Sequence, residues 1–190
     1  MFRSSMVSQM DIIEIMDQEW ANLKKQPSHY ERYKQRLLVN FPLDQYENNL
    51  IMPYTPLDEA EETEYLNCVN LFKGKKWLEV SLDPLYKNYS DFLFLTETGI
   101  KYYLPTFLLY FYDLKRLKHR YFDCFMDILE LGLKRKPKTD FSGFEYLTTE
   151  QAKLIAVFLV NVANLLSDDN PEKNRAQNAL INYWGNFLLF

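Results

Sequence analysis

The sequence predicts an all-α protein, a single globular domain of about seven helices in which one helix is kinked at Pro105. Helix-start signals recur along the chain, and apolar residues repeat at steps of three and four instead of alternating as in strands. The 190 residues are 47% hydrophobic and 16% aromatic, which is enough to bury one core. We therefore expect residues 1–190 to form one domain without an internal repeat or a linker.

Two helices are expected near the N-terminus. Ser8 is a helix-start residue, and one apolar face follows it, formed by Ile12, Ile13, Met16, Trp20 and Leu23. Ser28 and Glu31 form a capping box before the second helix. The apolar side chains of that helix are Tyr30, Tyr33, Leu37 and Phe41. Pro42 ends it, and the prolines and asparagines of residues 40–54 predict a connecting loop.

A third helix is predicted to begin at Thr55, with Pro56 at its first helical position, and to end at Gly74. Its apolar residues are Tyr65, Leu66, Val69 and Phe72. The helix dipole favours negative charge in the early turns, where five acidic residues lie: Asp58, Glu59, Glu61, Glu62 and Glu64. Residues 77–94 fit no regular period, so we expect short helical pieces and turns there, with a small strand pair around Trp77.

Thr96 is expected to cap a fourth helix, whose buried face is Phe107, Leu108, Phe111 and Leu114. Pro105 lies inside this helix and has no amide for the carbonyl four residues earlier, so the helix must kink or restart there. We expect the hydroxyl of Tyr102 or Tyr103 to donate a hydrogen bond to a carbonyl that Pro105 leaves free.

Three more helices follow. The first covers residues 118–133 and ends at Gly132 and Pro137, with four inward residues, Phe122, Phe125, Met126 and Leu129. A second capping box, Thr148 with Gln151, opens a helix whose polar stripe is so thin that it should be buried nearly all round. The last helix, residues 171–189, presents Ala176, Leu180, Tyr183, Trp184, Phe187 and Leu188.

The apolar runs, the N-terminal residues and the cysteines indicate the cellular compartment. No apolar run reaches the roughly 20 residues that span a bilayer, and the N-terminus lacks the features of a secretory signal. Cys68 and Cys124 lie in apolar-periodic segments, which favours reduced, buried thiols. We expect a cytoplasmic protein with no membrane partner. Its oligomeric state and its translation start, Met1 or Met6, stay open.

Four short motifs occur in order along the middle of the chain. They are LFKGKKW at residues 71–77, DFLFLT at 91–96, KYYLPTF at 101–107 and LTTEQ at 147–151. In this order they resemble a family of small bacterial proteins of unknown function, over roughly residues 60–165. Glu97 and Thr106 depart from the proline and the alanine or serine that family members carry. The resemblance implies a shared fold and no known chemistry.

No catalytic, metal or cofactor motif is present in the sequence, so we expect no enzyme. His29 and His119 have no other histidine or cysteine at metal-ligand spacing, and the five glycines are isolated, so they form no phosphate loop. Asp123, Asp127 and Glu130 share one helical face and could bind a divalent cation. Basic residues extend the same face, which favours a salt-bridged surface: Arg116, Arg120 and Lys134.

Two charged clusters have alternative interpretations. The five acidic residues 58–64 are either dipole-complementing surface or a docking face for a basic partner. The basic cluster consists of Lys115, Arg116, Lys118, His119 and Arg120, with Lys134, Arg135, Lys136 and Lys138. The net charge of −4 opposes general affinity for nucleic acid, so we expect no nucleic-acid partner.

These observations favour a non-enzymatic cytosolic protein-interaction module. Small size, acidic balance and the lack of a catalytic set point to an immunity protein, an antitoxin-like chain that neutralises a bacterial toxin or secreted effector. Its docking face would be Asp58, Glu59, Glu61, Glu62 and Glu64. One alternative is a small-molecule-binding or enzymatic domain with a pocket at the Pro105 kink, lined by Tyr102, Tyr103 and Phe107. Another is an adaptor subunit of a larger complex.

Overall fold

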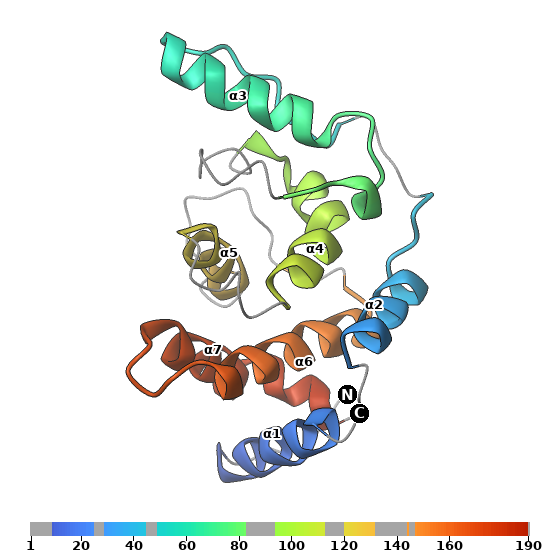
Figure 1. Ribbon diagram of the computed structural model, residues 1–190, viewed down its shortest axis with the longest axis vertical. Helices are drawn as coiled ribbons and strands as arrows, with labels where there is room; N and C mark the ends of the chain where they lie inside the picture. The colour runs from blue at the N-terminus through green and yellow to red at the C-terminus, as the bar shows by residue number, and fades with distance from the viewer. Residues whose placement is uncertain are drawn as a thin grey trace, which may run out of the picture.

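The computed structural model describes residues 9–24, 29–44, 49–82, 94–112, 120–131, 144 and 147–189. Over these residues the protein is an all-α domain, as the sequence predicts (Figure 1). The α-helices of the described residues are α1 (Gln9–Lys24), α2 (His29–Asn40), α3 (Glu59–Phe72), α4 (Glu97–Phe111), α5 (Arg120–Leu131), α6 (Thr149–Leu165) and α7 (Pro171–Asn182). Short 3₁₀-helices are present at η1 (Trp77–Glu79) and η5 (Trp184–Leu189). The expected strand pair around Trp77 is not found in the described part of the chain, where Trp77 begins η1 and an antiparallel bridge joins Ile51 to Leu95.

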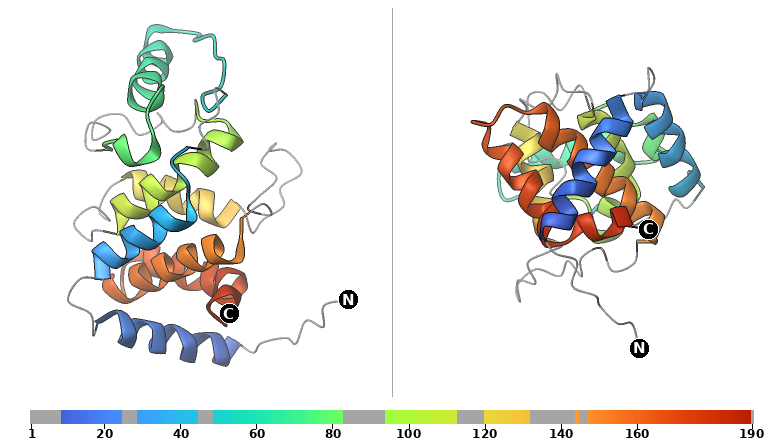
Figure 2. Two further views of the ribbon diagram at one scale, coloured as in Figure 1. Left: turned by 90° about the vertical axis from the view of Figure 1, so that its right-hand side faces the viewer. Right: turned by 90° about the horizontal axis from the view of Figure 1, so that it is seen from below.

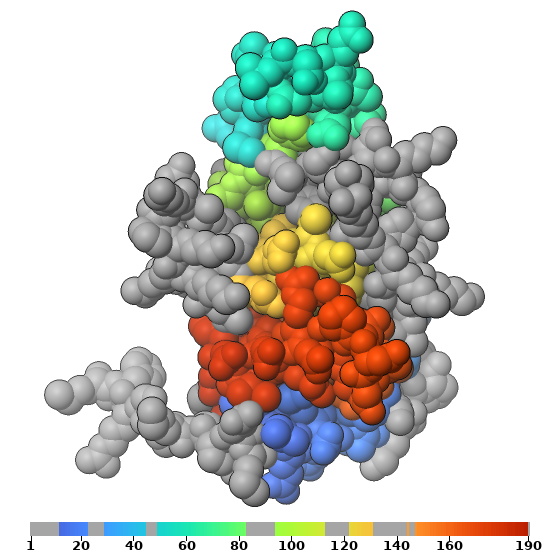
Figure 3. Space-filling view, turned by 90° about the vertical axis from the view of Figure 1, so that its left-hand side faces the viewer, coloured from blue at the N-terminus to red at the C-terminus, as the bar shows by residue number. Residues whose placement is uncertain are grey.

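The helices are arranged along one long axis. α1 lies at one end and α3 at the other, with the remaining helices between them (Figures 1 and 2). The space-filling view shows α3 as a knob at the far end of the molecule (Figure 3). None of the described helices is long and apolar enough to cross a membrane.

α6 is the central helix of the group formed by α1, α2, α6, α7 and η5. Its expected capping box is present, because the Thr148 hydroxyl accepts from the amide of Gln151 and the Gln151 side chain accepts from the amide of Thr148. Every side chain from 154 to 163 is buried, which confirms that this helix is covered nearly all round. α1, α2, α7 and η5 pack against it.

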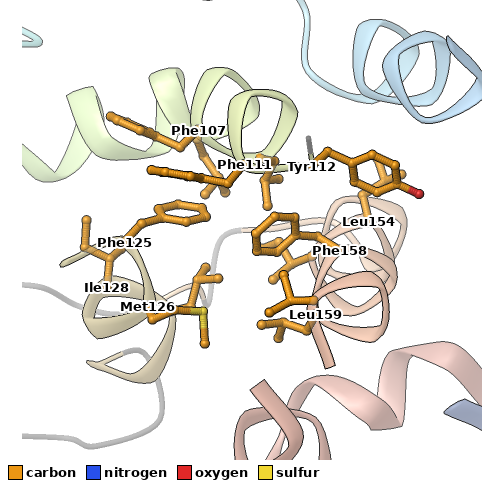
Figure 4. Packing of buried hydrophobic residues seen from close by; sticks show 14 of the residues in the cluster. Phe107, Phe111, Tyr112, Phe125, Met126, Ile128, Leu154, Phe158 and Leu159 are labelled. Atoms are coloured by element: carbon orange, nitrogen blue, oxygen red, sulfur yellow. The ribbon is translucent and has the colours of Figure 1, made fainter. Parts of the chain in front are cut away.

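Aromatic side chains fill the space between α4, α5 and α6 (Figure 4). The ring of Phe125 stacks on Phe107 and on Phe111, with centroids 5.6 and 5.5 Å apart, and meets Phe158 edge-on at 5.7 Å. Stacked and edge-to-face pairs add to the stabilisation that burial of these rings provides. The inward face predicted for α5 is confirmed, and the buried face of α4 is wider than predicted.

α4 continues through Pro105 as one helix, so it does not restart there. Both tyrosine hydroxyls donate to carbonyls of neighbouring segments and not to a carbonyl freed by Pro105, so that expectation is wrong. Side chains project away from their own helix axis, which brings other segments within reach. The acceptors are Leu43 O for Tyr102 at 3.0 Å, and Phe72 O and Lys75 O for Tyr103 at 2.6 and 3.0 Å.

The boundaries of two helices differ from the predicted ones. α3 begins at Glu59 and not at Thr55, because the carboxylate of Asp58 caps it by accepting from the amides of Ala60 and Glu61. At its other end Gly74 has φ +75°, as a glycine that ends a helix should. The predicted last helix is two elements, because Tyr183 has φ −154° and ψ −65° and separates α7 from η5.

Three of the apolar side chains that the sequence assigns to these helices are exposed, namely Ile13, Tyr30 and Leu66. Each helix contacts the body along only part of its apolar surface, and the packing partners decide which part. Cys68 and Cys124 form no disulfide with each other, and they are buried and half-buried respectively. Five expected helix-end or core residues lie outside the described residues: Ser8, Ser28, Leu114, Gly132 and Pro137.

The start of α4 lies close to the loop that precedes α3. The Thr96 hydroxyl donates to Asn49 O at 2.7 Å and accepts from the amide of Gly99, which confirms Thr96 as the cap. The Thr96 amide donates to Leu50 O at 3.0 Å. A Cβ atom on Gly99 would lie 2.0 Å from that same carbonyl oxygen, so only glycine fits here.

Gly99→Ala should therefore lower the free energy of unfolding by about 2 kcal/mol, measured by chemical denaturation. An alanine in an open helical position would instead raise it, by about 1 kcal/mol. Thr98→Ala, at the exposed neighbouring position, is the control and should change stability by less than about 0.5 kcal/mol. An unchanged or increased stability of Gly99→Ala would contradict the close approach.

Candidate functional site

α3 is the most projecting element of the described structure. Its C-terminal half is anchored to the body through the buried side chains of Cys68, Leu71 and Phe72. Its N-terminal half is held by an aromatic group of Tyr54, Tyr65 and Phe94, with centroids 5.0 to 5.8 Å apart. The outer side of this half faces solvent at one end of the molecule (Figure 3).

The five predicted docking residues differ in their contacts and in their exposure. Asp58 caps α3, and Glu61 Oε2 accepts from the Tyr54 hydroxyl and from the amide of Leu57, both at 2.8 Å. These two carboxylates therefore stabilise the start of the helix. Glu59 and Glu62 are exposed and make no side-chain hydrogen bond or ion pair with the described residues, and Glu64 is half-buried.

Apolar side chains lie beside the two exposed acids. Leu57 is 86% exposed and Leu66 is 47% exposed, although leucine is normally buried. Glu59, Glu62 and Leu66 follow one another at steps of three and four, so they form one stripe along α3. We call Leu57, Glu59, Glu62 and Leu66 the α3 surface. The sequence indicated the charges of this surface, but Leu66 stood out in it only as one of the apolar residues of the helix.

The predicted pocket residues at Pro105 are core side chains. Tyr102, Tyr103 and Phe107 are all buried, and the ring centroid of Phe72 lies 4.7 Å from that of Tyr103 and 6.1 Å from that of Phe107. Two cavities that described residues border are lined by other side chains. The smaller cavity, about 220 Å³, lies beside η1 and is bordered by Thr106 and Tyr110.

The larger cavity, about 400 Å³, lies between α1, α2 and α6. Arg32, Arg36 and His29 of α2 line it, together with Glu19 of α1 and the apolar side chain of Val157 from α6. Nothing in the sequence signalled this cavity, because its lining residues come from three helices and match no motif.

Tyr33 forms part of the wall of this cavity. Its ring stacks on that of Tyr112 at a centroid distance of 4.2 Å and an angle of 12°, and its hydroxyl donates to Leu154 O at 2.9 Å. The Tyr112 hydroxyl points away from the rings of Phe107 and Phe111 and has no hydrogen-bond partner among the described residues (Figure 4). Burial raises the pKa of both phenols, and the charge of Arg36 opposes this shift.

An ionic cluster joins α5 to α7. Arg175 donates to Asp127 at 2.6 Å, to Glu130 at 2.8 Å and to Glu172 at 3.0 Å. This confirms that the acidic face of α5 is salt-bridged, but its described partner comes from α7 and not from α5. Burial raises the pKa of Glu172, and the charge of Arg175 opposes this shift. No group of three or more potential ligands in the described chain is placed to hold a metal ion.

The predicted basic cluster and the C-terminus are only partly described. The side chains of the basic cluster, Lys115, Arg116, Lys118, His119, Arg120, Lys134, Arg135, Lys136 and Lys138, lie outside the described residues. At the C-terminus, Leu188 is buried, Phe187 is partly buried and Leu189 is 39% exposed. Most of η5 therefore contributes to the core.

Arg175→Gln should lower the free energy of unfolding by about 2 kcal/mol at pH 7, because it leaves the half-buried carboxylates unpaired. Without Arg175 the pKa of Glu172 rises further above its usual 4.5. The folded variant then keeps a proton that the unfolded chain has lost, so the deficit should shrink as the pH falls toward that value. A deficit independent of pH between about 5 and 8, measured by urea denaturation, would contradict the role of Glu172.

The stacked pair Tyr33 and Tyr112 offers a matched comparison. Tyr33→Phe should lower the free energy of unfolding by about 1 kcal/mol, because it removes a buried hydrogen bond. Tyr112→Phe removes a hydroxyl with no described partner and should leave stability unchanged or raise it. Equal losses for the two variants in thermal denaturation would show that the Tyr112 hydroxyl is bonded after all.

Comparisons with known proteins place the chain in a family. The comparisons with curated proteins and with solved structures find no match. The model of DUF6714, a family of unknown function, matches residues 46–188. This match is consistent with the resemblance to a family of unknown function and extends over α3 to η5. Because it covers most of the chain, the protein belongs to this family.

Proposed function

We propose that the protein is a non-enzymatic interaction module and that its α3 surface binds a partner protein with a basic and apolar face. The observation that carries this proposal is the exposure of Leu57 and Leu66 beside the unpaired acids Glu59 and Glu62, on the most projecting helix of the described structure.

The chemistry of the α3 surface supports a protein partner. Exposed leucines gain free energy when a partner removes them from water, at about 25 cal/mol per Å² of apolar area. Carboxylates beside them favour lysine or arginine on the partner, and such complementarity speeds encounter and selects the partner. The positive end of the α3 dipole does not remove this preference, because Asp58 already caps the helix.

The proposal also specifies what the protein does to its partner. Neutralisation of a bacterial toxin or secreted effector is the role that we favour, because an antidote acts by covering a site and needs surface instead of catalytic groups. An adaptor subunit would use the same surface, and the identity of the partner distinguishes the two roles. A cytoplasmic location belongs to this proposal. The pocket formed by Tyr102, Tyr103 and Phe107 gains no support from its geometry.

The test is the effect of charge reversal on binding to a partner purified from the native cells. Glu59→Lys with Glu62→Lys should weaken binding at least about tenfold, because unlike charges become like charges at the interface. The affinity for the unmodified protein should also fall with rising salt. Glu61 is left unchanged, because its carboxylate holds the loop before α3.

The matched control reverses two exposed acids at the other end of the molecule, Glu14→Lys with Asp17→Lys on α1. It makes the same change in net charge and should leave affinity within about twofold. If both double variants bind equally well, or lose affinity equally, the α3 surface is not the docking face.

A further inference from the structure

We propose that the cavity between α1, α2 and α6 is a binding site for a small organic anion, whose carboxylate or phosphate group pairs with Arg32 and Arg36. This site is separate from the α3 surface, and the proposal does not depend on the proposed function. The cavity volume of about 400 Å³ lies within the range of small-molecule sites.

The charged side chains of the cavity favour an anion. The guanidinium of Arg32 makes no hydrogen bond or ion pair with the described residues. Arg36 is 3.8 Å from Glu150, and both side chains of this pair are about half exposed, so the pair is weak. Among the described residues of the lining, Glu19 alone is acidic, which leaves the two arginines in excess. Guanidinium groups bind carboxylate and phosphate through paired hydrogen bonds.

The apolar side of the cavity is already in place. The ring of Tyr33 is held by its stack on Tyr112 and by its hydrogen bond to Leu154 O, so it keeps its position without a ligand. Val157 comes from the fully buried part of α6. A wall that needs no reordering on binding favours affinity. An aromatic or aliphatic group of the ligand would lie on this wall.

Two polar atoms next to this wall have no hydrogen-bond partner among the described residues. They are Nδ1 of His29, which lines the cavity, and the hydroxyl of Tyr112, whose ring centroid is 5.6 Å from that of His29. Tyr112 is 2% exposed. Buried polar atoms are nearly always bonded, so the pair indicates that a polar molecule occupies this region. A purely apolar ligand would leave both atoms unsatisfied.

The test is a ¹⁵N NMR titration of the full chain with three probes: phenyl phosphate, benzoate and benzyl alcohol. We expect at least one of the anions to shift α2 amide signals in a saturable way, and the neutral alcohol to shift them little. Whether phenyl phosphate or benzoate binds more tightly tells which anionic group the site takes. No shift in α2 with either anion, or equal shifts with benzyl alcohol, would overturn the proposal.

Charge variants identify the site. Arg32→Gln and Arg36→Gln should each weaken the binding of the tighter anion at least about tenfold, because each removes a direct ionic contact. Lys34→Gln is the matched control, since it removes the same charge from the same helix but at a position outside the lining. If Lys34→Gln weakens binding as much as the arginine variants do, the effect is one of general charge and the proposal fails. Unchanged amide patterns elsewhere show that each variant is folded.

Discussion

The burial of α6 on nearly all sides is the constraint on which the rest of the body depends. A helix whose side chains 154–163 are all buried must be covered by other elements, and α1, α2, α7 and η5 provide that cover. Hydrogen bonds determine the position in which α2 packs against α6. Gln151 donates to Asn40 O at 2.7 Å, and Tyr33 donates to Leu154 O. Such bonds are directional, so they set the position of α2, while apolar contact supplies most of the stabilisation.

α3 has a different relation to the core. Only its C-terminal half is buried, and the Tyr103 hydroxyl meets carbonyls at that end. The other half is supported by Tyr54, Tyr65 and Phe94 and by the carboxylates of Asp58 and Glu61. The outer side of the N-terminal half of α3 is therefore exposed to solvent. The chain combines a buried centre with a projecting helix.

The two proposed binding regions are independent for a structural reason. The α3 surface lies at one end of the molecule, whereas the cavity lies beside α1, the helix at the other end (Figure 2). The first is convex, acidic and apolar, which suits a protein. The second is concave and has an excess of arginine, which suits a small anion.

The sequence by itself determined the helices and several of their ends, because caps and periodicity are local properties. The Thr148 capping box, the Thr96 cap, the Gly74 terminus and the buried face of α5 all follow from residues a few positions apart. Only the tertiary structure decided which faces are covered. It left Leu66 exposed, paired Arg175 with α5 and brought Glu19, Arg32 and Val157 to one cavity. These contacts join residues far apart in the chain, so no local pattern encodes them.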